Sequence, residues 1–319
     1  KKLAIYFHWP FCLSKCPYCD FNAHAFENVD HDRHRAAYQK ALTFYAEKLK
    51  GREVVSVFFG GGTPSLMKPE MVGALLSDIK KHWSVSSDIE ITLEANPTSV
   101  EIEKFKAFRD AGVNRISLGI QSFIDKDLKF LGRAHDVAGA KKAIEIADQC
   151  FERYSFDLIY GRPDQSLSDW EVELKEALAF AKGHMSLYQL TIERSTPFYM
   201  RHSRGEFKVP DDVEGADFYH LTQDIMEEGG LPAYEVSNHS SQGQESCHNL
   251  VYWHYEDYIG IGAGAHGRFT LEGQKLAARD HSAPDIWLER AEEKGHGAHE
   301  WEVISPEDQF TESLMMGLR

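Results

Sequence analysis

The chain has 319 residues, of which 35 are Lys or Arg and 50 are Asp or Glu, so its formal net charge is −15. This acidic balance argues against a surface that tracks nucleic-acid phosphates, and a small or anionic ligand would need a local basic pocket. Five cysteines are too few and odd in number for a disulfide framework, which favours a reducing, cytoplasmic compartment, and no apolar run approaches the ~18 residues of a membrane span.

Six short, β-rich apolar runs recur along the chain, each followed by an amphipathic helical pattern. The runs cover residues 3–8, 54–59, 89–94, 115–120, 154–160 and 185–191. The clearest helical patterns cover residues 32–49, 69–83, 99–111, 138–150 and 168–181. This alternation predicts an α/β fold with a parallel sheet, either open and doubly wound or curved into a barrel whose strand ends meet at one mouth.

The alternation stops after Glu193. Residues 201–209 are polar and basic, residues 213–228 have a helical pattern, and residues 234–269 are rich in Gly and His. We therefore predict two regions, residues 1–200 and a smaller α+β region at residues 201–319. The final residues, 306–319, form a helical pattern without a terminal cap, and we expect that the natural protein continues beyond them.

Three cysteines follow the first predicted strand with the spacing Cys-x3-Cys-x2-Cys: Cys12, Cys16 and Cys19. Pro10 and Pro17 disfavour a regular helix there, as expected of a loop that wraps a metal cluster. A [4Fe-4S] cluster normally takes four cysteines, so three would leave one iron open to another ligand. Zinc is the alternative, but structural zinc prefers paired ligands and no second Cys-x-x-Cys follows. Three unpaired core thiols are the remaining alternative.

Polar residues with ligand-binding chemistry stand at the carboxyl ends of the predicted strands, where barrel enzymes place their sites. The turn Gly60-Gly61-Gly62-Thr63-Pro64 follows the second strand, and its glycines would let backbone amides approach a ligand, although a tight turn with no ligand is the alternative. Glu94 ends the third strand and could accept hydrogen bonds from ribose hydroxyls or an ammonium group, or simply face solvent.

The next two strands carry further candidates. Gln121 ends the fourth strand and Arg133 lies twelve residues on, a pairing of amide and guanidinium that suits a carboxylate-bearing ligand. Arg133 alone could equally form a surface ion pair. Asp157 lies inside the apolar fifth strand, where an acid should be paired or bound to a ligand.

As a set, these motifs resemble the radical S-adenosylmethionine superfamily, in the branch of the oxygen-independent coproporphyrinogen III oxidases (HemN) and the haem chaperones (HemW). The resemblance covers nearly the whole chain and includes the run Tyr6–Cys12, Gln121-Ser122-Phe123 and Gly262-Ala263-Gly264-Ala265-His266. It implies a partial (β/α)6 barrel holding a [4Fe-4S] cluster, with S-adenosylmethionine on the open iron. The nucleoside pocket would be lined by Tyr6, Tyr18, Gly61, Gly62, Thr63, Glu94, Gln121, Arg133 and Asp157.

Two departures separate the chain from the oxidases: Phe21 stands where they carry a further cysteine, and their long amino-terminal extension has no counterpart before the cysteine loop. The run His248-Asn249-Leu250-Val251-Tyr252-Trp253 matches one associated with HemW. The resemblance therefore implies haem binding and delivery to an acceptor protein, with an electron donor such as flavodoxin or ferredoxin and no assigned catalytic residue. Oxidative decarboxylation of coproporphyrinogen III is the alternative, and radical methylation of a flat heteroaromatic is a third hypothesis.

Two histidines are candidates for contact with haem. His248 could instead form hydrogen bonds inside an aromatic core. His266, in the glycine-rich turn, could contact the nucleoside cofactor or bind haem iron. The neighbouring Trp253, Tyr255 and Tyr258 could stack on a flat macrocycle or pack in the core.

Overall fold

The computed structural model describes residues 1–26 and 28–319, and six parallel strands form the centre of its main sheet. They are β1 (Lys2–Trp9), β4 (Glu53–Gly61), β5 (Ser84–Ala95), β6 (Arg115–Gln121), β7 (Arg153–Tyr160) and β8 (His184–Gln189). All six predicted strands are confirmed, and they lie side by side in chain order. An order that never reverses is that of a barrel wall, so the doubly wound alternative is excluded.

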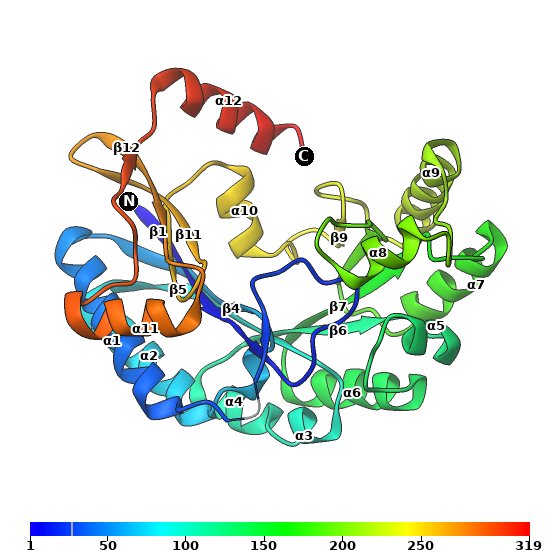
Figure 1. The fold of residues 1–319 in the computed structure, drawn as a ribbon, viewed down its shortest axis with the longest axis horizontal. Coiled ribbons are helices and arrows are strands. Elements are labelled where there is room, and N and C mark those ends of the chain that lie inside the picture. The colour runs from blue at the N-terminus through cyan, green and yellow to red at the C-terminus, as the bar shows by residue number, and fades with distance from the viewer. Residues whose placement is uncertain (27) are drawn as a thin grey trace.

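Helices cover one face of these strands, as Figure 1 shows along its lower edge. They include α1 (His31–Lys48), α2 (Pro69–His82), α4 (Phe105–Ala111), α6 (Val137–Cys150) and α7 (Leu167–Leu178). The helix predicted at residues 99–111 is interrupted, because α3 (Ser99–Ile102) precedes α4 as a separate turn. The Glu101 carboxylate accepts hydrogen bonds from Asn96 N at 2.8 Å and Thr98 Oγ1 at 3.0 Å, which tie the α3 turn to the end of β5.

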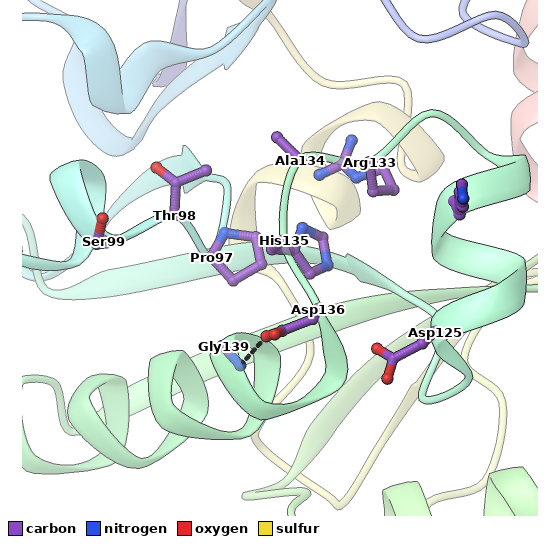
Figure 2. A pocket seen from close by; sticks show the side chains of 10 residues that line it. Pro97, Thr98, Ser99, Asp125, Arg133, Ala134, His135, Asp136 and Gly139 are labelled. Atoms are coloured by element: carbon purple, nitrogen blue, oxygen red, sulfur yellow. Dashed lines mark hydrogen bonds between the residues drawn. The ribbon is translucent and has the colours of Figure 1, made fainter.

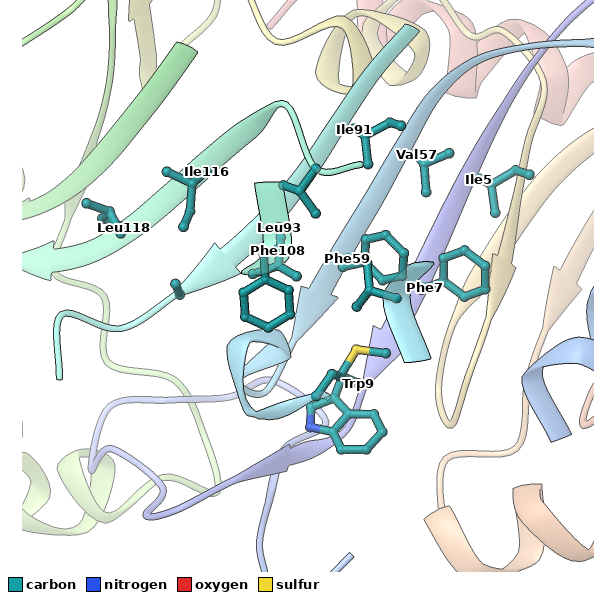
Figure 3. Close-up of a cluster of buried hydrophobic side chains, with 14 of the residues drawn as sticks. Ile5, Phe7, Trp9, Val57, Phe59, Ile91, Leu93, Phe108, Ile116 and Leu118 are labelled. Atoms are coloured by element: carbon teal, nitrogen blue, oxygen red, sulfur yellow. The ribbon is translucent and has the colours of Figure 1, made fainter. Parts of the chain in front are cut away.

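The main core lies between the sheet and these helices. Ile5, Phe7, Val57 and Phe59 are buried there, and the Phe7 and Phe59 rings stack with centroids 4.9 Å apart (Figure 3). Because side chains alternate along a strand, the neighbours of these residues point to the opposite face. That opposite face receives the polar residues described below.

The chain beyond residue 200 extends the same sheet at both edges. β9 (Asn238–Ser240) pairs antiparallel with β8, and β10 (Tyr258–Ile261) pairs parallel with β1. β11 (His266–Leu271), β12 (Gln274–Arg279) and β13 (Glu302–Val303) continue outward from β10. The division of the chain at residue 200 stays a prediction.

The remaining helices are α5 (Asp125–Phe130), α8 (Pro197–Ser203), α9 (Asp212–Glu228), α10 (Cys247–Trp253), α11 (Pro284–Lys294) and α12 (Pro306–Gly317), with a 3-10 turn at Pro64–Leu66 and the short pair β2 (Phe11–Cys12) and β3 (His24–Ala25). In Figure 1, α10 and α12 lie across the sheet from α1 and α2. Among the described residues, no helix combines the length and apolarity needed to cross a bilayer.

Candidate functional site

The cysteine loop leaves the carboxyl end of β1, where barrel sites form. Cys12 lies on β2 and is buried, whereas Cys16 and Cys19 are half-buried, with Cys19 N donating to Cys16 O at 3.1 Å. Burial, together with the nearby Cys19 and Cys16 thiols, raises the pKa of Cys12 to about 11. Burial also raises the pKa of Cys19. Cys12 and Cys19, whose ionisation is disfavoured in this way, are donors that a positively charged metal centre would stabilise as thiolates.

The spacing of these thiols bears on the zinc alternative. Within residues 1–26 and 28–319, no three His, Cys, Asp or Glu side chains converge closely enough to hold one metal ion. In a [4Fe-4S] cluster each cysteine binds a different iron, so the sulfurs lie farther apart than around a single ion. Ligation of a cluster by the three cysteines therefore stays a prediction, with zinc as its alternative.

Two residues that sequence reasoning left unassigned hold this loop in place. His8 Nδ1 accepts from the Tyr6 hydroxyl at 3.0 Å, and His8 Nε2 donates to Asn22 O at 2.9 Å. The Asn22 amide in turn donates to Ala263 O at 2.8 Å. The loop is thus tied both to β1 and to the turn before β11. The sequence feature that could have pointed to His8 is its position between Phe7 and Trp9, which are both core residues.

The glycine turn after β4 packs against the cysteine loop. Gly62 N donates to Trp9 O at 2.7 Å, Thr63 N donates to Phe11 O at 2.8 Å, and Gly61 N donates to Glu94 Oε2 at 3.1 Å. A Cβ at Gly62 would lie 2.6 Å from Phe11 O, so this close approach of two backbones requires glycine there. These three amides already have partners within the protein, so the turn shapes the site through packing.

Two carboxylates, Glu94 of β5 and Asp157 of β7, lie near enough to influence each other across β6. Burial and the nearby Asp157 raise the pKa of Glu94 to about 8, and burial raises the pKa of Asp157 to about 6. Tyr6 lies close enough for Glu94 to contribute to raising its pKa, after the larger effect of burial. Two acids confined together favour a cationic ligand, and S-adenosylmethionine carries both a sulfonium and an ammonium.

Arg133 connects the cysteine loop to the strand ends. Its guanidinium donates to Cys16 Sγ at 3.4 Å, to Gly119 O at 2.8 Å and to Asn96 Oδ1. Tyr18 lies beside it, and burial, opposed by the Arg133 charge, raises the pKa of Tyr18. Asn96, which sequence reasoning missed, also donates to Thr63 Oγ1 at 3.2 Å. The sequence signal for Asn96 was its place two residues after Glu94.

Gln121 is held in a conformation that non-glycine residues rarely adopt, with φ of 73°. Such strain costs on the order of 1–3 kcal/mol and clusters at functional sites. Its Oε1 is buried and, within the described part of the chain, has no hydrogen-bond partner. A buried acceptor without a partner is unfavourable, so this oxygen fits an absent polar ligand.

A cavity of about 540 Å³ borders this region, between the segment after β5 and the start of α6. Figure 2 shows Arg133 and His135 on one wall and Pro97 beside them. Asp136 accepts from Gly139 N at 2.7 Å and caps α6 at the floor. Arg133 thus contributes both to this cavity and to the surroundings of Cys16.

The two candidate histidines occupy different environments. His248 is 1% exposed, and its Nδ1 lies 2.9 Å from Ser56 Oγ while its Nε2 lies 2.8 Å from the Tyr252 hydroxyl. Burial lowers the pKa of His248 to about 3. Contact with haem iron would require one of these hydrogen bonds to open, so a role of His248 in haem binding stays a prediction. His266 is exposed and lines a separate cavity.

The burial of Glu94, together with its nearness to Asp157, raises its pKa and predicts a pH-dependent stability that Glu94→Gln should reduce. Between its ordinary pKa of 4.5 and its raised value near 8, the folded chain keeps a proton on Glu94 that the unfolded chain has released. The contribution of this proton to the free energy of unfolding is therefore complete below pH 4.5. It is lost as the pH rises through the folded-state pKa of about 8, by an amount of the order of a few kcal/mol. The urea midpoint of the wild type should fall more steeply between pH 5 and 8.5 than that of Glu94→Gln.

The exposed Glu103→Gln is the control for this measurement and should retain the wild-type slope. Equal slopes in the wild type and Glu94→Gln would show that Glu94 does not retain its proton in the folded chain.

Comparison with known proteins gives a family for this arrangement. The Radical SAM superfamily model matches residues 6–177. The mitochondrial radical S-adenosyl methionine domain-containing protein 1 of Danio rerio is 38% identical over 99% of this chain and 72% of its own length. Heme chaperone HemW of Escherichia coli is 42% identical over 86% of this chain and 72% of its own, and that of Bacillus subtilis is 34% identical over 99% and 83%.

Among solved structures, coproporphyrinogen III oxidase (HemN) from Escherichia coli, described as a radical SAM enzyme, matches with a TM-score of 0.83. The match covers 99% of this chain and 75% of that one at 20% identity. At this identity the likeness shows a common fold alone, and it confirms the partial barrel predicted from the sequence.

Proposed function

The chain belongs to the radical S-adenosylmethionine superfamily and, within it, to the HemW family, and from this membership we propose that it binds haem and delivers it to haem-accepting proteins. The observation that carries the proposal is the likeness to heme chaperones across most of the chain, at much higher sequence identity than to the coproporphyrinogen oxidase. Phe21 supports the same choice, because an exposed phenylalanine stands where the oxidases have a cysteine.

Membership of the superfamily implies a [4Fe-4S] cluster and S-adenosylmethionine. We infer that Cys12, Cys16 and Cys19 hold the cluster, because they form the single cysteine group at the mouth of the barrel in the described chain. When bound, the two groups would supply one-electron chemistry at the sulfonium. Arg133, which donates to Cys16 Sγ, would place a cation and a hydrogen-bond donor beside that ligand.

The strand-end residues would position S-adenosylmethionine beside the cysteine loop. The Glu94 and Asp157 carboxylates would face its positive charges, and the free Oε1 of Gln121 would accept a hydrogen bond from it. Tyr18 would contact the adenine, and Tyr6 would close the pocket on the β1 side. Gly61, Gly62 and Thr63 would keep the loop close to the end of β4.

The proposal also requires partners. Haem transfer needs an acceptor protein, and a redox-active cluster needs an electron donor such as flavodoxin or ferredoxin. The compartment stays a prediction, since the relatives include proteins named mitochondrial as well as bacterial heme chaperones.

A direct test compares the two activities in one preparation. The protein is reconstituted anaerobically, titrated with haem, and incubated separately with coproporphyrinogen III, S-adenosylmethionine and a reductant. We expect saturable haem uptake, seen as a Soret band at one haem per chain, with no protoporphyrinogen formed. Conversion of coproporphyrinogen III would overturn the proposal in favour of oxidative decarboxylation.

A further inference from the structure

A second cavity, of about 610 Å³, opens on the inner side of β1. Pockets for small molecules and cofactors fall in the range of about 300–1,000 Å³. Tyr6 and His8 form its β1 side, α10 and β10 contribute Tyr252 and Tyr258, and α12 closes it with methionines. The cavity therefore meets the proposed cofactor pocket at Tyr6 but extends away from it.

The walls of this cavity are mainly aromatic and apolar. Tyr252 and Tyr258 meet edge to face with ring centroids 4.6 Å apart, and Trp253 lies beside Tyr252. Met315 and Met316 of α12 face them across the cavity. Aromatic rings and thioethers adapt well to a flat macrocycle. The indole N–H of Trp253 is buried and has no partner among the described residues, so it can donate to a polar edge of a ligand.

Two histidines line the cavity, and they differ in what their ring nitrogens do. Both nitrogens of His8 are occupied, by the Tyr6 hydroxyl and by Asn22 O. For the His266 ring, the structure of residues 1–26 and 28–319 provides no hydrogen bond, and the residue is exposed. A ring nitrogen of His266 is therefore open to a ligand in this cavity.

Helix α12 forms one wall of the cavity. None of its described residues is buried. Glu312 holds the helix near the cavity through polar contacts, and Arg319, just after the helix, lies over the Trp253 ring at 4.5 Å from its centroid. Glu312 accepts from the Tyr255 hydroxyl at 2.6 Å and from Arg268 Nη2 at 3.0 Å. Arg268 is thus a cation at the cavity wall whose partner, Glu312, belongs to α12. A carboxylate on a ligand would compete with Glu312 for Arg268.

We propose that this aromatic cavity is the haem site, with His266 binding the iron, the macrocycle against Tyr252 and Tyr258, and a propionate near Arg268. The inference rests on the proposed function and specifies it, because it assigns the haem to one cavity and one ligand. The proposed site also places the haem next to the cysteine loop, since Asn22 joins that loop to the turn before His266.

The test titrates ferric haem into the full chain carrying His266→Ala and compares it with His254→Ala. His254 is the matched control, because it is exposed and close in sequence to the cavity residues but does not line the cavity. We expect His266→Ala to shift the Soret maximum and to weaken haem affinity at least about tenfold, while His254→Ala leaves both unchanged. Added imidazole should restore the wild-type spectrum of His266→Ala, which a merely structural effect would not produce.

The outcomes separate the two proposals. If the wild type takes up no haem, the proposed function fails and the site fails with it. If the wild type binds haem and His266→Ala shows the same spectrum and affinity, only the site is wrong. If His266→Ala weakens S-adenosylmethionine binding and leaves haem binding intact, the cavity serves the nucleoside cofactor instead.

Discussion

Anaerobically reconstituted Cys16→Ser protein is expected to lack the broad iron–sulfur absorbance entirely. A serine hydroxyl ionises far less readily than a thiol, so it cannot replace a thiolate on iron near neutral pH. In the proposed ligation, three cysteines already leave one iron without a protein ligand, and the loss of Cys16 would leave only two anchors. The check is the visible spectrum together with the iron content per chain.

Cys150→Ser is the control for this experiment. Cys150 is a free, half-buried thiol at the end of α6, outside the cysteine loop. Its replacement should leave the spectrum and iron content unchanged. A full cluster in Cys16→Ser would contradict the ligand assignment, and loss of iron in both variants would point to a general folding defect.

The central sheet could be predicted from the sequence because its strands are long and regular. Each of the six has an apolar run next to an amphipathic helix. This local pattern predicts the strand, and its repetition along the chain predicts that consecutive strands pair in parallel. The outer strands had no comparable signal. β9 has three residues and β13 has two, too few for any periodicity. The pairing of β10 with β1 joins residues far apart in the chain, which no local pattern records.

In the site, too, residues with a clear local sequence pattern could be predicted, whereas contacts that depend on the course of the chain could not. Glu94 and Asp157 could be singled out because each is an acid within or at the end of an apolar strand, and the structure brings them together. The contact of Arg133 with Cys16 depends on how the loop after α5 returns to the cysteine loop, so residue type alone could not reveal it. For His248 the sequence left open either contact with haem or hydrogen bonds inside an aromatic core, and the structure shows two hydrogen bonds to its buried ring.

A second large effect is expected away from the cofactors, at a buried ion pair that supports Gln121. Arg162 is 1% exposed and its guanidinium pairs with Glu173 of α7 and, at 3.1 Å, with Asp127. Glu173 Oε1 also accepts from Ser122 Oγ at 2.7 Å and from Phe123 N at 2.8 Å. One carboxylate therefore compensates a buried charge and fixes the two residues that follow Gln121.

Glu173→Ala should lower the free energy of unfolding by about 3–5 kcal/mol, because it leaves the Arg162 charge buried without its main partner. Glu176→Ala, one turn along the same helix, removes an exposed pair with Lys141 and should cost about 1 kcal/mol or less. Urea midpoints of the two variants measure the difference. Equal midpoints would mean that Asp127 alone compensates Arg162. The segment after Gln121 would then depend on its own backbone geometry, and the strained φ of Gln121 would have to be maintained without Glu173.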